Sequence, residues 1–169
     1  MRTADLLADA FGRVRYEVHQ CVDNLGPDEL SYRPDGAANS IAWLIWHLTR
    51  IQDDHVADVA GTEQVWTADG WADRFDLPFL ASATGYGHGS AEVAAVQPKS
   101  GEMLTGYHDA VYQRTLRYLP GLTDQDLDRV VDSSWDPPVT LGVRLISVIS
   151  DDLQHVGQAL YLRGLLTAR

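Results

Sequence analysis

Four stretches of the chain place apolar residues every three or four positions, which is the spacing of an amphipathic α-helix. The second stretch follows Asn39 and Ser40, both favoured N-caps, and it stops at Gly61, a favoured residue at helix C-termini. The third stops at Pro120, since proline cannot continue a helix. The four stretches cover residues 3–24, 39–61, 101–119 and 140–166. The pattern predicts an all-α fold.

The connections between these helices differ greatly in length. Residues 62–100 separate the second helix from the third and contain a glycine-rich segment, residues 85–89. A connection this long inside a compact domain is typical of a bundle with a crossover. We therefore predict a single domain over residues 1–169, a four-helix bundle with a long crossover between helices two and three. The shorter linker, residues 123–138, is expected to hold one short helix.

Acidic residues outnumber lysine and arginine 24 to 13, so the formal net charge is −11. This charge excludes the basic surface by which proteins bind nucleic acids. No apolar run approaches the ~20 residues of a membrane-spanning helix, and the first residues lack a signal-peptide pattern. We expect a soluble, cytoplasmic protein without a nucleic-acid or membrane partner. The single cysteine, Cys21, excludes an internal disulfide, and its position on an apolar helix face predicts a buried residue rather than a nucleophile.

Polar residues on apolar helix faces are the informative exceptions to the amphipathic pattern. His47 falls at the edge of the apolar stripe of the second helix. Asp151 and His155 are four residues apart on the fourth helix, so their side chains share one face. If the two helices pack together, His47, Asp151 and His155 can hold one metal ion and leave open positions for water or a substrate. In the alternative interpretation, both histidines are hydrogen-bonded core residues and Asp151 is their salt-bridge partner.

Two segments resemble a known family. The string WLIWHL at residues 43–48 and the string DDLQHVGQALYLR at residues 151–163 are similar to the DinB/YfiT-like superfamily, in the branch that includes mycothiol-dependent maleylpyruvate isomerase. The resemblance implies a four-helix bundle with one divalent metal ion, zinc or nickel, held by His47, Asp151 and His155. Aspartate at position 151 is one methylene shorter than the glutamate of similar members, so Asp152 is the alternative ligand.

The resemblance also implies an activity, the transfer of a mycothiol-type low-molecular-weight thiol to an electrophile. A metal-bound thiol is a thiolate at neutral pH, and the thiolate is the nucleophile. Gln158, Arg163 and Trp43 are the expected substrate contacts.

Two other functions remain open from the sequence. The first is a metal-dependent hydrolase with Asp54, Asp152 or His55 as general base. The second is a non-catalytic metal-binding or dimerisation module, with exposed tryptophans at the interface of a homodimer.

The remaining histidines lie outside the expected site. His88, in the glycine-rich segment, lacks the lysine and the strand–helix context of a phosphate loop, and we expect it not to approach the site. His19 and His108 are interpreted as surface or helix-packing residues.

Overall fold

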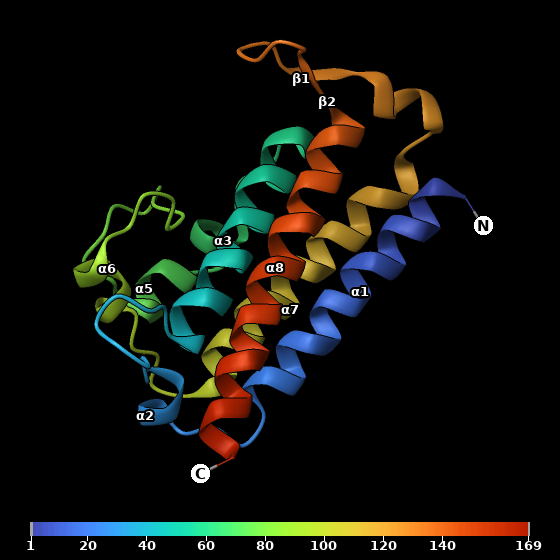
Figure 1. Cartoon of the computed structure of the whole chain (residues 1–169). Coiled ribbons are helices and arrows are strands. Elements are labelled where there is room, and N and C mark those ends of the chain that lie inside the picture. The colour runs from blue at the N-terminus through green and yellow to red at the C-terminus, as the bar shows by residue number, and fades with distance from the viewer. Residues whose placement is uncertain (1, 169) are drawn as a thin grey trace.

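The computed structural model describes residues 2–168 and is built mainly from helices (Figure 1). The four long helices are α1 (Thr3–Val22), α3 (Ile41–Ala60), α7 (Gly101–Tyr118) and α8 (Leu141–Thr167). The shorter ones are α2 (Pro27–Leu30), α4 (Val65–Ala68), α5 (Trp71–Phe75), α6 (Ser90–Ala95) and the 3-10 helices η1 (Leu119–Gly121) and η2 (Asp124–Asp128). Two short antiparallel strands, β1 (Val130–Asp132) and β2 (Val139–Thr140), form the only sheet within residues 2–168. The predicted all-α class is confirmed.

The helices α3 and α8 begin, and α3 ends, next to the capping residues that the sequence predicts. The Ser40 hydroxyl accepts a hydrogen bond from the Trp43 amide at 3.1 Å, and this N-cap begins α3. Gly61 ends α3 in the left-handed conformation, with φ at 64°, which glycine adopts without steric cost. Thr140 caps α8 in the same way as Ser40 caps α3. These caps set the positions of the two helices that carry the candidate site.

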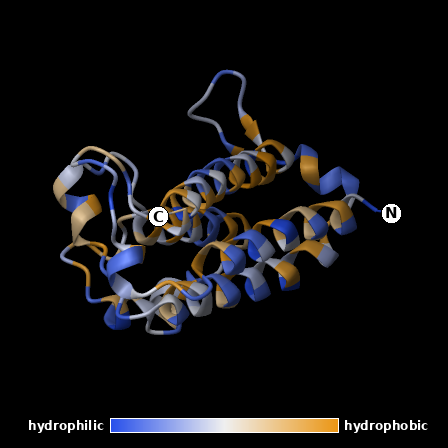
Figure 2. Ribbon diagram, turned by 60° about the horizontal axis from the view of Figure 1, so that its bottom comes forward, coloured by the Kyte–Doolittle hydropathy of each residue, from blue (hydrophilic) through white to orange (hydrophobic). Residues whose placement is uncertain are grey.

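The helices α3 and α7 run in one direction, while α1 and α8 run in the other (Figure 1). Both α1 and α3 pack against α7 and α8, so the four long helices form a bundle. Residues 61–100 connect the parallel helices α3 and α7 and carry α4, α5 and α6 along one side of the bundle. Figure 2 shows hydrophobic and hydrophilic residues alternating along the long helices, as expected for amphipathic helices.

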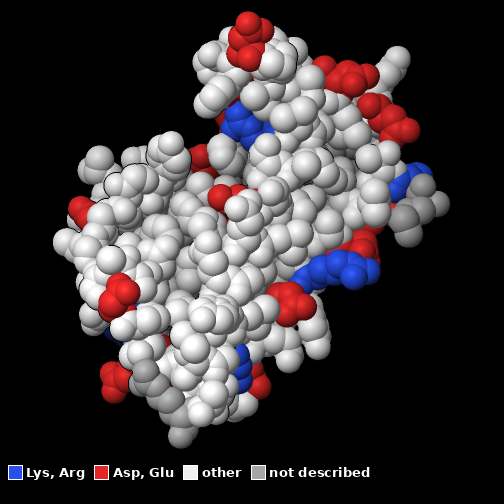
Figure 3. All heavy atoms as spheres, in the orientation of Figure 1, with Lys and Arg blue, Asp and Glu red and all other residues white. Residues whose placement is uncertain are grey.

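The outer face of α8 is unusually apolar for a surface helix. Figure 3 shows few charged side chains over the face that α8 presents. Its exposed apolar residues are Val143, Ile146, Leu153, Tyr161 and Leu165.

Among the tryptophans, Trp135 in the β1–β2 hairpin is the exposed one, at 67%. The homodimer stays a prediction. Within residues 2–168, no helix combines the length and the hydropathy needed to cross a membrane.

His108 lies in the bundle interior and packs between helices, as expected. Its ring is fully buried, and Nδ1 lies 3.2 Å from the Thr49 hydroxyl. The Thr49 hydroxyl donates to the Ile45 carbonyl, so it accepts from His108. Burial lowers the pKa of His108 from 6.5 to about 4, because the charged imidazolium would lose its hydration.

This burial predicts acid destabilisation. Between pH 6.5 and 4 the unfolded chain binds a proton at His108 and the folded chain does not, so stability is lost as the pH falls. The full shift corresponds to about 3 kcal/mol. In His108→Leu the side chain at this position cannot titrate. Between pH 7 and 4, the free energy of unfolding of this variant should therefore fall by about 3 kcal/mol less than that of the unsubstituted protein. Urea unfolding at several pH values measures this difference, and parallel pH curves for the two proteins would contradict it.

Candidate metal centre

His47, Asp151 and His155 meet where α3 packs against α8. One ligand atom from each residue lies within 4.8 Å of the other two. His47 is buried, whereas Asp151 and His155 are half-buried, so the group has a closed side and an open side. The two imidazole rings stand edge to face, with their centroids 4.8 Å apart. The structure therefore brings together the three residues that the spacing picked out, from segments more than one hundred residues apart in the sequence.

A hydrogen bond fixes which nitrogen of His47 is available. Nδ1 lies 2.6 Å from the Thr84 carbonyl, and a carbonyl only accepts, so Nδ1 carries the proton. Burial lowers the pKa of His47, which keeps the ring neutral. The remaining nitrogen, Nε2, therefore has a free lone pair. This is the arrangement of a metal-ligating histidine, whose other ring nitrogen donates to a backbone carbonyl or a carboxylate.

His155 is oriented in the same manner by a side chain. Its Nδ1 lies 3.0 Å from Oε1 of Gln158, one turn later on α8. Its Nε2 lies 3.6 Å from Oδ1 of Asp151. The hydrogen bonds to Asp151 and Gln158 raise the pKa of His155, the larger effect coming from Asp151. A metal ion at this place would compete with the proton that His155 and Asp151 otherwise share.

Asp151 supplies the observation that favours a bound cation over a simple ion pair. Its second oxygen, Oδ2, is buried and has no hydrogen-bond partner among residues 2–168. A buried polar atom without a partner costs free energy, so such atoms usually mark a missing ligand, water or ion. Two neutral imidazoles and a carboxylate form a donor set that suits zinc and nickel. The residues present therefore fit a divalent metal ion.

The alternative ligand, Asp152, does not join this group. Its side chain is fully buried in the bundle interior, and neither oxygen has a partner within the described chain. Burial, and to a lesser extent the neighbouring Asp151, raises the pKa of Asp152 well above its usual range. Of the two aspartates, Asp151 is therefore the one whose carboxylate lies with the two histidines, where α3 and α8 are in contact.

Of the three expected substrate contacts, Trp43 and Gln158 lie at the candidate site and Arg163 does not. Trp43 stacks on the His47 ring, with centroids 4.6 Å apart, and so forms a wall of the site. Gln158 orients His155 and is exposed beside it. Arg163 does not point to the site, because its guanidinium donates to the carbonyls of Cys21 and Asp23 at 3.0 and 2.7 Å. The geometry therefore gives Arg163 a structural role at the C-terminus of α1 in place of the expected substrate contact.

The glycine-rich segment reaches the site, contrary to the expectation for His88. Nε1 of Trp43 donates to Nδ1 of His88 at 3.2 Å, and the His88 ring packs against Trp46 and Phe79. Nδ1 of His88 accepts this bond, so the proton of the neutral ring is on Nε2. His88 is therefore part of the wall around His47, through Trp43.

Gly85 makes this close approach possible. Its φ is 94°, and a Cβ added there would lie 2.6 Å from Nδ1 of His47. Only glycine allows the backbone to pass this near the imidazole while Thr84 accepts its hydrogen bond. The alternating glycines of residues 85–89 were the available sequence signal, but periodicity alone does not show which side chain the backbone approaches.

We expect Gly85→Ala to weaken metal binding by roughly 10- to 100-fold, the usual effect of losing an outer-shell partner. Gly87→Ala is the matched control, because Gly87 also has a positive φ, 77°, but a Cβ there meets nothing within 4 Å. Competition of each variant with a chromogenic zinc chelator measures the affinity. Equal affinities for the two variants would show that the contact of Gly85 with His47 has no effect on the site.

The other polar residues that the sequence analysis considered are already engaged. Asp54 accepts a hydrogen bond from the Gln64 amide at 2.7 Å. Nδ1 of His55 lies 2.6 Å from a nitrogen of Arg144, and burial lowers the pKa of this histidine. His19 pairs with Asp109 at 2.9 Å, at the surface between α1 and α7.

Cys21 is fully buried, and burial raises its pKa to about 12. The expectation of a buried cysteine holds, and the chain offers no thiolate of its own.

Comparison with known proteins agrees with this architecture. The sequence profile described as DinB superfamily matches residues 10–159. A crystal structure of a conserved protein from Enterococcus faecalis is similar over 100% of this chain and 99% of that chain, with 28% sequence identity and a TM-score of 0.93. No curated protein sequence matches. Since the family profile covers most of the chain, including His47, Asp151 and His155, the protein belongs to the DinB superfamily.

Proposed function

We propose that this protein is a divalent-metal-dependent thiol S-transferase, which joins a low-molecular-weight thiol of the mycothiol type to an electrophile. The observation that carries the proposal is the group of His47, Asp151 and His155, which has three ligand atoms and one open side. Three protein ligands with an open position are typical of catalytic metal sites, whereas structural sites are closed by a fourth ligand.

His47, Asp151 and His155 would hold zinc or nickel. The chemistry that such an ion supplies, when bound, is a lowered thiol pKa, so that the sulfur is a thiolate at neutral pH. The thiol proton would pass to solvent when the thiol binds, and the thiolate sulfur would then form a bond to the electrophilic carbon while the leaving group departs with its electron pair. Thr84 and Gln158 keep the two imidazoles in the ligating orientation, and Trp43 closes the site behind His47.

The burial of Cys21 implies that the reacting thiol comes from outside the chain. The only cysteine of the chain is buried, and its pKa of about 12 leaves it protonated at neutral pH. Any thiol chemistry at this site therefore needs a thiol that diffuses in through the open side.

The hydrolase alternative has less support, because it needs a free general base beside the metal-bound water. Asp152 is fully buried and outside the group, Asp54 accepts from Gln64, and Nδ1 of His55 is occupied by Arg144. Thiol transfer does not need these groups, since the proton is released when the thiol binds.

The test is turnover of 1-chloro-2,4-dinitrobenzene by the zinc- or nickel-loaded protein, with and without mycothiol. We expect an increase in absorbance of the thioether product that requires both metal and thiol and that is lost in His47→Ala. Metal-dependent release of chloride without thiol would favour the hydrolase. A metal-loaded protein with no turnover under either condition would favour the non-catalytic module.

A further inference from the structure

A groove of about 560 Å³ lies next to the candidate metal centre, between the start of α3, the loop before it and the second half of α8. Gln158 belongs both to the groove lining and to the hydrogen bond that orients His155. Leu44, also in the lining, is one helical turn before His47 on α3. The groove therefore lies beside the candidate ligands and shares Gln158 with them, and its volume is in the range of small-molecule sites.

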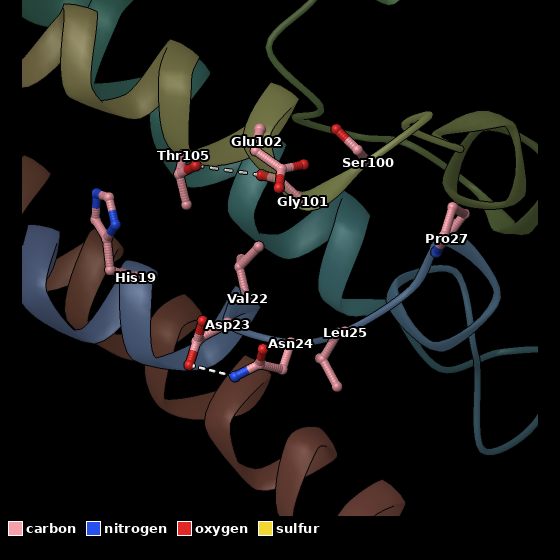
Figure 4. A pocket seen from close by; sticks show the side chains of 10 residues that line it. All are labelled: His19, Val22, Asp23, Asn24, Leu25, Pro27, Ser100, Gly101, Glu102 and Thr105. Atoms are coloured by element: carbon pink, nitrogen blue, oxygen red, sulfur yellow. Dashed lines mark hydrogen bonds between the residues drawn. The ribbon is translucent and has the colours of Figure 1, made fainter.

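The lining of this groove contains no charged residue. It consists of Ala37, Ala38, Asn39, Leu44, Gly157, Gln158, Tyr161 and Leu162. A second cavity, of about 340 Å³ between the end of α1 and the start of α7, is different, because His19, Asp23 and Glu102 line it (Figure 4). In that cavity the Asp23 carboxylate already accepts from Asn24. The groove is thus the apolar one of the two.

Two arginines lie close to the groove in the sequence, and both are occupied. Arg33 donates to the carbonyls of Gly36, Ala38 and Ser90. Arg163 donates to the carbonyls at the end of α1. Neither guanidinium is left to pair with a carboxylate in the groove. Burying an unpaired carboxylate there would be costly, and the net charge of −11 adds repulsion.

Three residues of the groove lining, Asn39, Gln158 and Tyr161, carry neutral polar groups. Because Oε1 of Gln158 accepts from His155, its amide NH2 group is directed elsewhere and has no partner among residues 2–168. The exposed ring of Tyr161 supplies most of the apolar contact area, and the buried side chains of Leu44 and Leu162 form the floor of the groove. This combination suits an uncharged, largely apolar group, with or without a carbonyl oxygen that accepts from Gln158.

We infer that the groove binds the uncharged apolar part of the electrophile. The inference names the substrate class of the proposed transferase and therefore rests on that function for its biological meaning. The binding preference itself is a property of the groove and can be measured without turnover.

The experiment compares two fluorescent probes of similar shape on the zinc-loaded protein. N-phenyl-1-naphthylamine is uncharged, and 8-anilino-1-naphthalenesulfonate is an anion. Gly157→Phe fills the groove, and Gly164→Phe is its matched control, since both glycines are exposed on α8 and an added Cβ meets nothing within 4 Å at either. Only Gly157 lines the groove.

We expect the uncharged probe to bind at least about 10-fold more tightly than the anion, a modest factor for an apolar pocket. Gly157→Phe should weaken binding of the uncharged probe by a similar factor, while Gly164→Phe should leave it within about 2-fold, because a surface change away from a pocket has little effect. Equal affinities for the two probes, or equal losses in the two variants, would overturn the inference.

A separate readout distinguishes this inference from the proposed function. Cobalt-substituted protein titrated with benzyl mercaptan should develop a sulfur-to-cobalt absorption band. Absence of this band while the uncharged probe still binds in the groove would reject the thiol transferase and keep the groove. A normal band without any preference between the two probes would reject the groove and keep the transferase.

Discussion

His47→Ala is expected to lower the affinity for zinc or nickel by more than 100-fold and to leave the purified protein essentially free of metal. The reason is that the variant loses one of three ligand atoms, whereas loss of an outer-shell partner alone costs about 10- to 100-fold. His155→Ala should have the same effect, since His155 is the second imidazole of the group. Elemental analysis after dialysis against metal-free buffer, together with chelator competition, measures both the content and the affinity.

The control for these variants is His19→Ala, which also removes a histidine but acts at the surface, where His19 pairs with Asp109. We expect His19→Ala to retain the metal. Circular dichroism of all three variants should show an unchanged helical content. Retention of metal by folded His47→Ala would remove the basis of the assignment.

Asp53→Ala is expected to destabilise the fold by about 3–5 kcal/mol, the cost of leaving a buried charge without its partner. The Arg50 side chain is fully buried, and its NH1 lies 3.6 Å from Oδ2 of Asp53. Asp53 also accepts hydrogen bonds from the amides of Val65 and Trp66 and from the hydroxyl of Tyr107. The variant therefore loses the contacts that attach the start of the crossover to α3.

Urea or guanidinium unfolding measures this loss, and Asp58→Ala provides the matched comparison. Asp58 is an exposed carboxylate on the same helix, and its removal should change stability by no more than about 0.5 kcal/mol. Similar stabilities for the two variants would mean that the buried pair contributes nothing.

Arg50 of this buried pair also connects the crossover to the candidate metal centre. Arg50 donates to the carbonyls of Ala83 and Ala81, at 3.0 and 3.4 Å. Ala83 directly precedes Thr84, whose carbonyl orients His47. The crossover is therefore attached to α3 next to the residue that orients the candidate ligand His47.

Much of this architecture could be predicted from local pattern. The apolar period and the caps at Ser40 and Gly61 placed α3 closely, because these signals depend on a few neighbouring residues. The spacing of Asp151 and His155 placed two candidate ligands on one helix face for the same reason. Convergence with His47 was a hypothesis, which the packing of α3 against α8 supports.

The other parts of the site depend on contacts between residues distant in the sequence. Nothing local shows that Arg163 bonds to the end of α1, because its partners are backbone carbonyls more than one hundred residues away. The position of His88 depends on how the crossover folds over Trp43, and irregular segments have no period from which to read their direction. The choice of Asp151 over Asp152 depends on the rotation of α8, which the packing of the whole bundle sets.

The most direct test of the metal centre is X-ray absorption at the zinc edge of the zinc-loaded protein. Our account predicts one zinc ion per chain with two imidazole ligands, at about 2.0–2.1 Å, and a carboxylate oxygen at a similar distance. In His155→Ala, the imidazole scattering should fall or the metal should be absent. A zinc environment made only of oxygen ligands, or one that is unchanged in His155→Ala, would contradict the assignment of His47, Asp151 and His155 as the metal centre.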